Sequence, residues 1–114
     1  MRPDDLIRLR HMADAAREAI DFVRGRSRNT LDNDLQLVWA LTKAVEIIGE
    51  AANQMAESSR SEVPGLPWED IINMRHRLVH AYFDINLDIL WKTVQEDLPS
   101  LISILEPLIP PEVP

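Results

Sequence analysis

The sequence predicts an all-α fold, an antiparallel bundle of four or five helices formed by a single domain over residues 1–114. Apolar side chains recur at steps of three and four along most of the chain, which is the spacing of one face of a helix. No segment alternates apolar and polar residues for long enough to indicate a strand. The chain also has no internal repeat or low-complexity tract that would indicate another architecture.

The first two predicted helices are long. One apolar stripe from Leu6 to Val23 predicts a helix that ends near Gly25, and a second predicts a helix over residues 30–57 with Asn29 or Thr30 as its N-cap. Gly49 lies in the middle of the second helix, where glycine costs about 1 kcal/mol relative to alanine. We therefore expect another backbone to pass close to Gly49.

In the second half of the chain, the sequence pattern predicts one loop and two or three more helices. Residues 58–67 form the loop because their prolines and glycine cannot continue a helix, while Pro67 suits a first helical turn. The third helix then runs over residues 68–82. Asn86 is a candidate cap for the next segment, and Pro99 predicts a kink or restart before the last one.

Composition limits the class of protein. The chain has no cysteine, which excludes disulfides and thiolate metal sites. Its N-terminus is polar at once, and no stretch approaches the roughly 20 apolar residues of a membrane span. We expect a soluble, cytoplasmic protein, and its 114 residues favour a homodimer because self-association would bury more surface.

The net charge of −7 argues against a general nucleic-acid binder, since phosphate binding depends largely on Lys and Arg. Positive charge collects at two places, the turn with Arg24, Arg26 and Arg28 and the segment from Arg75 to Tyr82. The turn could steer RNA, although cations at the end of a helix also suit its dipole. The second segment could hold one phosphate in a cleft.

Four polar side chains gather on the predicted third helix. At about 100° per residue, Arg75, His76, His80 and Tyr82 share one arc with large apolar groups. We therefore expect this helix to be central in the bundle or to lie at a subunit interface. Buried there, the polar groups would each need partners.

Two interpretations of this cluster remain open. In the structural one, Arg75 bonds to Glu46 or Glu50 of a neighbouring helix and the histidines are satisfied core groups. In the functional one, His80 is a general acid/base and Arg75 grips a phosphate with two donors. That pair fits transesterification at an RNA phosphate, with no metal or cofactor required.

A metal site is the third possibility, because His76 and His80 are four residues apart and that spacing suits two zinc ligands on a helix. We disfavour it. There is no Glu directly after His76 in the protease arrangement, and no Glu-x-x-His pair. Glu46 and Glu50 could complete such a site, but a salt-bridged pair of helices explains them more simply.

A longer pattern resembles a known family. The segments that carry the resemblance are Trp68-x-x-Ile71-x-x-Met74-Arg75-x-Arg77-Leu78-Val79-His80-x-Tyr82-Phe83, then Asp88-Ile89-Leu90-Trp91-x-Thr93-Val94-x-x-Asp97-Leu98-Pro99, and the earlier Glu46-Ile47-Ile48-Gly49-Glu50-Ala51-Ala52. Together they resemble the HepT-like branch of the HEPN superfamily. The resemblance covers the second to fourth helices well.

The resemblance implies a dimeric helical bundle in which two Arg-x4-His motifs approach a shared cleft. It implies a metal-independent ribonuclease, the toxin of a toxin–antitoxin pair, with Arg75 and His80 catalytic. Its partner would be a minimal nucleotidyltransferase of the MNT type that transfers AMP onto Tyr82. The family commonly has Asn where this sequence has His76, which could support catalysis. The alternative is a non-catalytic helical subunit that docks the nucleotidyltransferase or binds its nucleotide.

Overall fold

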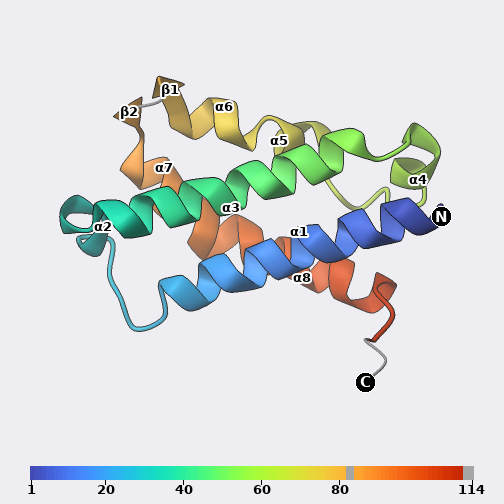
Figure 1. The fold of residues 1–114 in the computed structure, drawn as a ribbon, viewed down its shortest axis with the longest axis horizontal. Coiled ribbons are helices and arrows are strands. Elements are labelled where there is room, and N and C mark those ends of the chain that lie inside the picture. Colours follow the sequence, from blue (N-terminus) through green and yellow to red (C-terminus); the bar gives the residue numbers. More distant parts are fainter. Residues whose placement is uncertain (82–83, 112–114) are drawn as a thin grey trace.

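The computed structural model describes residues 1–81 and 84–111, and of residues 80 and 81 the backbone alone. It confirms the all-α fold class. Four helical segments run antiparallel to one another in chain order: α1 (Pro3–Phe22), α3 (Leu35–Gln54), the pair α5 (Trp68–Ile72) and α6 (Met74–Leu78), and the run from α7 (Leu87–Lys92) to α8 (Leu98–Leu105) (Figure 1). Two short helices, α2 (Thr30–Asn33) and α4 (Glu57–Ser61), lie in the connections.

The core lies between α1, α3 and the α7–α8 run. Small residues on α1, among them Ala13, Ala16 and Ala19, are fully buried and let α3 approach closely. The larger apolar side chains that fill the space between the helices are Leu9, Met12, Leu41, Val45, Ile48, Leu90, Leu98 and Leu105, all fully buried. In the part of the chain described, no helix is both long and apolar enough to cross a membrane.

The prediction of one helix over residues 30–57 is wrong at Asp34. Its backbone leaves the helical region (φ −132°, ψ 88°), and its carboxylate caps α3 by accepting a hydrogen bond from the Leu37 amide at 3.0 Å. Asn29 stands at the N-cap of α2 but makes no side-chain capping bond. Asp34, a residue that the sequence pattern placed inside the helix, therefore sets the start of the long helix.

The prediction of a loop over residues 58–67 is wrong at its start, because Glu57–Ser61 forms α4, which a buried carboxylate holds in place. Asp5 of α1 is only 1% exposed and accepts hydrogen bonds from the Ser59 hydroxyl at 2.6 Å and the Ala56 amide at 3.3 Å. Arg8 donates to its other oxygen at 2.7 Å. The Ser59 hydrogen bond, followed by that from Arg8, lowers the pKa of Asp5 against the opposing effect of burial.

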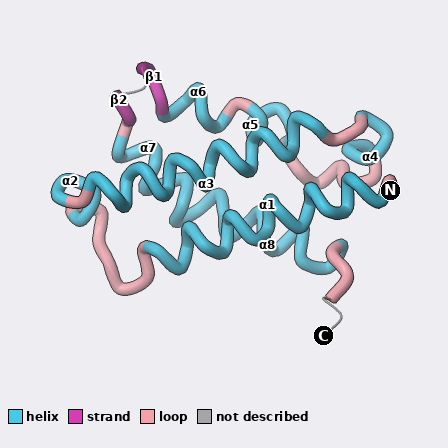
Figure 2. Tube along the Cα trace, in the orientation of Figure 1, coloured by secondary structure: helices cyan, strands magenta, loops and turns pink. Residues whose placement is uncertain are grey.

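The third helical segment begins at Trp68 as predicted but ends at Leu78, so the expected helix over residues 68–82 is wrong in its last turn. Asn73 interrupts it between α5 and α6. Val79 is extended (φ −114°, ψ 104°), and β1 (Val79–Ala81) pairs antiparallel with β2 (Asp84–Ile85) beside α7 (Figure 2). β-Branched Val79 suits this extended backbone.

Gly49 meets another backbone, as its position in the sequence predicted. A Cβ atom on Gly49 would lie 3.3 Å from the carbonyl oxygens of both Ile71 and Ile72. The end of α5 therefore packs directly on the middle of α3. This contact fixes the distance between α3 and the segment that carries Arg75.

The final helical run contains the irregularity that Pro99 predicted. Asn86 caps α7 through a hydrogen bond from the Ile89 amide at 3.0 Å, which confirms the expected cap. Thr93–Asp97 (η1) then forms a π-helical turn before α8. Pro99 has no amide hydrogen and its ring crowds the carbonyl four residues earlier, so a widened turn accommodates it without ending the helix.

Candidate functional site

An open groove of about 460 Å³ lies between α3 and the α5–α6 segment. We call it the Arg75 groove; its lining residues are Glu46, Gly49, Glu50, Asn53, Ile72, Arg75 and His76. Glu46, Gly49, Glu50 and Asn53 recur at steps of three and four and so share one face of α3. The close approach at Gly49 brings that face against the α5–α6 segment.

Arg75 lies across this groove from α3. Its Nε donates a hydrogen bond to Oε1 of Glu46 at 2.9 Å, and this is the one hydrogen bond of the Arg75 side chain among the described residues. The side chains of Arg75 and Glu46 are 48% and 31% exposed. The other carboxylate oxygen of Glu46, Oε2, lies 4.0 Å from Nζ of Lys43.

The contact between Arg75 and Glu46 is the one that the structural interpretation predicted. The expected burial of the polar cluster, in contrast, is wrong for Arg75 and His76 in this chain. Met74 and Leu78 are the side chains of α6 that enter the core, and the positions between them, including Arg75 and His76, face outward. The guanidinium is therefore open to a ligand from solvent.

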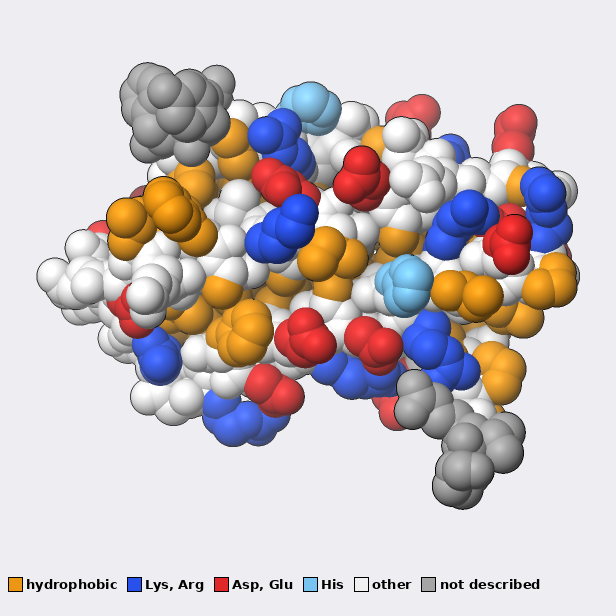
Figure 3. Space-filling model, in the orientation of Figure 1, with side chains coloured by type: hydrophobic (Ala, Val, Ile, Leu, Met, Phe, Trp, Pro, Cys, Tyr) orange, Lys and Arg blue, Asp and Glu red, His pale blue; other side chains and the backbone are white. Residues whose placement is uncertain are grey.

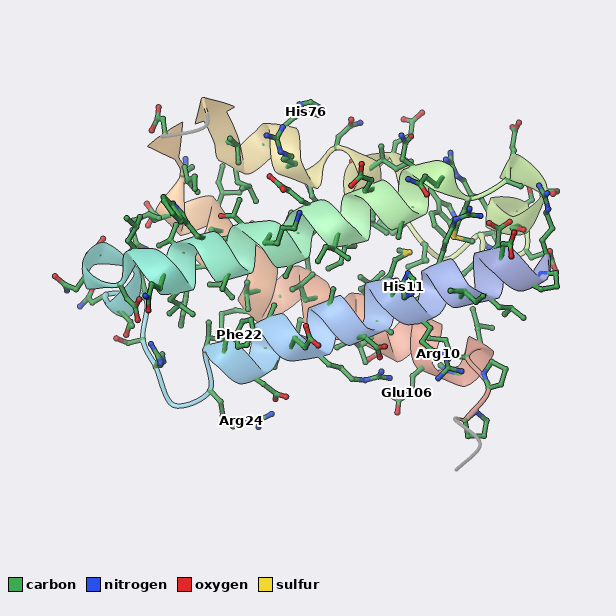
Figure 4. The ribbon with its side chains drawn as sticks, in the orientation of Figure 1. Arg10, His11, Phe22, Arg24, His76 and Glu106 are labelled. Carbon is green, nitrogen blue, oxygen red and sulfur yellow. The ribbon has the colours of Figure 1, made fainter. Side chains whose placement is uncertain are left out.

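His76 is exposed and lies at the outer edge of the molecule on α6 (Figure 4). Its backbone amide donates to the Asn73 carbonyl at 3.0 Å, which holds the first turn of α6. His76 also lines the Arg75 groove. His76 is thus on the same surface as the Arg75 guanidinium.

The other two predicted site residues lie at the limit of what is described. The backbone of His80 belongs to β1, while its side chain lies outside the described part of the structure, as does the whole of Tyr82. Because the helix ends at Leu78, the single helical arc that joined all four residues stops there. Arg75 and His76 remain together on α6, and His80 follows on an extended segment.

The zinc interpretation, which the sequence disfavoured, required one continuous helix through His76 and His80, but α6 ends at Leu78. Glu46 and Glu50 do share the Arg75 groove with His76. Within residues 1–81 and 84–111, however, no group of three or more His, Asp or Glu side chains is placed to hold a metal ion.

The basic turn between α1 and α2 is neutralised by ion pairs. All three of its arginines contact carboxylates, and two hydrogen bonds from Arg28, to Asp88 and to Asp32, raise its pKa. The ion pairs are Arg24–Asp21, Arg26–Asp34, Arg28–Asp32 and Arg28–Asp88. Each arginine of the turn is therefore engaged by a carboxylate, and Arg28 connects the turn to α7 through Asp88.

Sequence reasoning missed a second groove beside the first. It lies between α1 and α3, measures about 400 Å³ and shares Glu50 with the Arg75 groove. The residues that line it are Asp4, Ile7, Arg8, His11, Ile47, Glu50, Ala51 and Gln54. Figure 3 shows acidic, basic and apolar side chains mixed over this face, without one large field of a single sign. The signal in the sequence was that Ile7 and His11 are four residues apart and so share one face of the first helix.

Comparison with known proteins identifies the family. The model of the family described as "Ribonuclease HepT-like" matches residues 12–108. The "Probable ribonuclease HepT" of Thermococcus cleftensis is 37% identical over 95 residues, which cover 80% of this chain and 86% of that protein. A protein of Methanocaldococcus jannaschii named a "Putative RNase" is 33% identical over 93 residues, or 82% of this chain and 85% of its own.

A similarly named protein of Caldanaerobacter subterraneus is also 33% identical over 93 residues, which cover 82% of this chain and 83% of the relative. No solved structure matches the chain at a significant level. The family match and these relatives confirm the resemblance that the motifs around Arg75 indicated. This chain therefore belongs to the ribonuclease HepT-like family.

Proposed function

We propose that this chain is a metal-independent endoribonuclease in which Arg75 and His80 cleave RNA by acid–base catalysis. The observation that carries the proposal is the state of Arg75, which lines the groove with its side chain 48% exposed and whose guanidinium is bonded only at Nε, to Glu46, among the described residues. A guanidinium is always charged and matches the geometry of a phosphate. Family membership and the ribonuclease names of the relatives support the same activity.

The proposed reaction is a transesterification within the RNA. A histidine removes the proton of the 2′-hydroxyl, the 2′-oxygen attacks the adjacent phosphorus, and the bond from phosphorus to the 5′-oxygen breaks. The leaving 5′-oxygen takes up a proton, so that proton number is conserved. His80 is one of the two proton-transfer groups, and His76, on the edge of the same groove, supplies the other. Arg75 stabilises the negative charge that accumulates on the phosphoryl oxygens.

Cleavage of a labelled single-stranded RNA in EDTA tests this function. The wild-type protein should cut the RNA in the presence of the chelator, and the His80→Ala and Arg75→Ala variants should each lose at least about 100-fold in rate. Arg77→Ala is the matched control, since it removes a neighbouring exposed cation that does not line the Arg75 groove. RNA that stays intact under all conditions would refute the proposal, and cleavage abolished by EDTA would restore the metal interpretation.

The biological setting that we propose is a toxin–antitoxin pair with a homodimeric toxin. Support for a dimer comes from large apolar side chains on the outward faces of α1 and α3, of which Trp39 is 62% exposed. The others on these two faces are Ile7, Phe22, Leu35 and Ile47. Large apolar side chains left exposed on a short chain are typical of a self-association surface.

The proposed antitoxin is a nucleotidyltransferase of the MNT type that transfers AMP onto Tyr82. Tyr82 follows Arg75 by seven residues in the sequence. An added nucleotide would bring bulk and a negative phosphate to the segment that carries Arg75 and His80, and would compete with RNA for the guanidinium. Modification would thereby block the nuclease without unfolding it.

One observation favours a second candidate function. The ion pair between Arg75 and Glu46 is also what a purely structural network would contain. In that case the chain is a non-catalytic subunit that docks the nucleotidyltransferase or binds its nucleotide on the same surface. Co-purification with the nucleotidyltransferase, combined with the absence of RNA cleavage by the free wild-type chain, would support this candidate over the nuclease.

A further inference from the structure

We propose that Glu46 is a positioning residue that fixes the orientation of the Arg75 guanidinium for the substrate phosphate. The inference rests on the proposed nuclease function and adds to it a residue outside the Arg-x4-His motif. Glu46 touches neither reacting proton in the proposed reaction. It acts through Arg75, whose Nε it holds at 2.9 Å.

The two residues lie on elements of unequal length. Glu46 is in the interior of α3, a 20-residue helix that packs on both α1 and α5. Arg75 is in α6, a helix of five residues bounded by Asn73 and by the extended Val79. A short element of this kind does little to hold a long side chain in one conformation. The contact from α3 supplies the missing constraint.

Gly49 makes the contact geometrically possible. It lies one turn after Glu46 on α3, and the space above it is filled by the carbonyl oxygens of Ile71 and Ile72. This approach sets the backbone of the segment from α5 to α6 at a fixed height over α3. Glu46 therefore lies within reach of the Arg75 guanidinium, because the backbone of Arg75 is held at this distance from α3.

The choice of Nε decides what the guanidinium presents to the groove. Arg has five N–H donors, and the hydrogen bond to Glu46 occupies the one on Nε. Four donors on the two terminal nitrogens remain, and as a pair they can grip two phosphate oxygens. A carboxylate on Nε also prevents a phosphate from binding along the Nε side, so one orientation of the substrate is selected.

A different role for Glu46 predicts the opposite sign. If its carboxylate merely competes with RNA for the guanidinium, removing it should strengthen RNA binding and speed cleavage. Glu50 separates the two roles, because it lines the same groove but makes no hydrogen bond or ion pair to Arg75 within the described part of the chain. Removal of its charge changes the field in the groove without releasing the guanidinium.

The kinetic test uses the full chain and a labelled single-stranded RNA. Glu46→Ala should lower kcat at least about 10-fold while KM changes less than about 3-fold, because the guanidinium loses its orientation in the transition state. Glu46→Gln keeps an oxygen acceptor for Nε and should retain at least a third of wild-type kcat. Glu50→Gln should lower kcat clearly less than Glu46→Ala does, because it leaves the bond to Arg75 in place. A rate for Glu46→Ala equal to or above wild type would overturn the proposal.

A double-mutant cycle excludes a general structural defect. In the Arg75→Ala background, Glu46→Ala should change the residual rate less than about 2-fold, since the residue acts through Arg75 alone. A further loss as large as that in the wild-type background would overturn the positioning role. An equal loss for Glu46→Gln and Glu46→Ala would overturn it too.

Solvent exchange of the Arg75 Nε–H tests the contact with Glu46 even if the chain cleaves no RNA. Failure of the proposed function is therefore distinguishable from failure of this inference. The Nε–H signal of Arg75, assigned in the nuclear magnetic resonance spectrum by its loss in Arg75→Lys, should exchange slowly with solvent in the wild type. It should stay slow in Glu46→Gln and become fast in Glu46→Ala. Fast exchange in the wild type would show that Glu46 does not hold Arg75.

Discussion

Gly49→Val is the substitution that connects packing to the site most directly. Even a Cβ atom at this position would lie 3.3 Å from two carbonyl oxygens, and the methyl groups of valine have no space unless the end of α5 moves away from α3. Overpacking of this kind costs about 2 kcal/mol of unfolding free energy. For a chain of 114 residues, that loss corresponds to a melting temperature lower by roughly 8 °C.

The same displacement reaches the site. Ile72 and Arg75 belong to the segment that must move, so the guanidinium should leave Glu46. A shift of about 1 Å can cost on the order of 100-fold in rate, and we expect RNA cleavage by Gly49→Val to fall between about 10-fold and 100-fold. Gly49→Ala should change stability little, because the tight contact opposes a gain in helix propensity of about 1 kcal/mol.

Thermal unfolding followed by circular dichroism, together with the RNA cleavage rate measured well below the melting temperature, tests both parts. Gly65→Val is the matched control, since a Cβ atom there would meet nothing within 4 Å, and it should change unfolding free energy by less than about 0.5 kcal/mol. If Gly49→Val keeps the melting temperature and the cleavage rate of the wild type, the packing argument is refuted.

Three further predictions concern stability, assembly and control. Asp5→Ala leaves the buried hydroxyl of Ser59 without its acceptor and should lower the unfolding free energy by about 3 kcal/mol in urea denaturation. Because the pKa of Asp5 is lowered in the folded protein, this stabilisation of the wild type should persist above about pH 4 and be lost as the pH falls below it. An Asp5→Ala protein that keeps full stability would contradict this prediction. Trp39→Asp should convert the proposed dimer to a monomer in light scattering with unchanged helicity in circular dichroism, while Leu108→Asp, exposed on another element, should not; a wild-type monomer would be the contrary result. Incubation with the nucleotidyltransferase and ATP should add the mass of AMP to the wild type and not to Tyr82→Phe, and the same added mass on that variant would place the modification elsewhere.

Helical periodicity was enough to predict the bundle and the approach to Gly49, but it could not locate the ends of the elements. Leu31, Leu35 and Val38 keep the spacing of one helical face across Asp34, so the pattern continues where the backbone breaks. The break follows from a local competition, in which the carboxylate of Asp34 bonds to the Leu37 amide in place of a continuous helix. Periodicity carries no information about that competition.

One contact of the candidate site was predictable from the sequence, while the geometry of the segment that carries it was not. The sequence indicated that Arg75 could pair with Glu46, and the structure contains that pair. It did not indicate that Arg75 would be exposed, because the helical arc was extended through residues that form β1. Pairing of β1 with β2, a tertiary contact, overrides the helical pattern after Leu78.

The chemical ends of the cleaved RNA test the central claim most directly. Attack by the 2′-oxygen with departure of the 5′-oxygen requires a 2′,3′-cyclic phosphate on one fragment and a 5′-hydroxyl on the other. Mass spectrometry of the fragments made by the wild-type protein in EDTA should find these two ends, and His80→Ala should form them at least about 100-fold more slowly. Fragments that carry a 5′-phosphate and a 3′-hydroxyl, or RNA left intact by the wild type, would contradict the account.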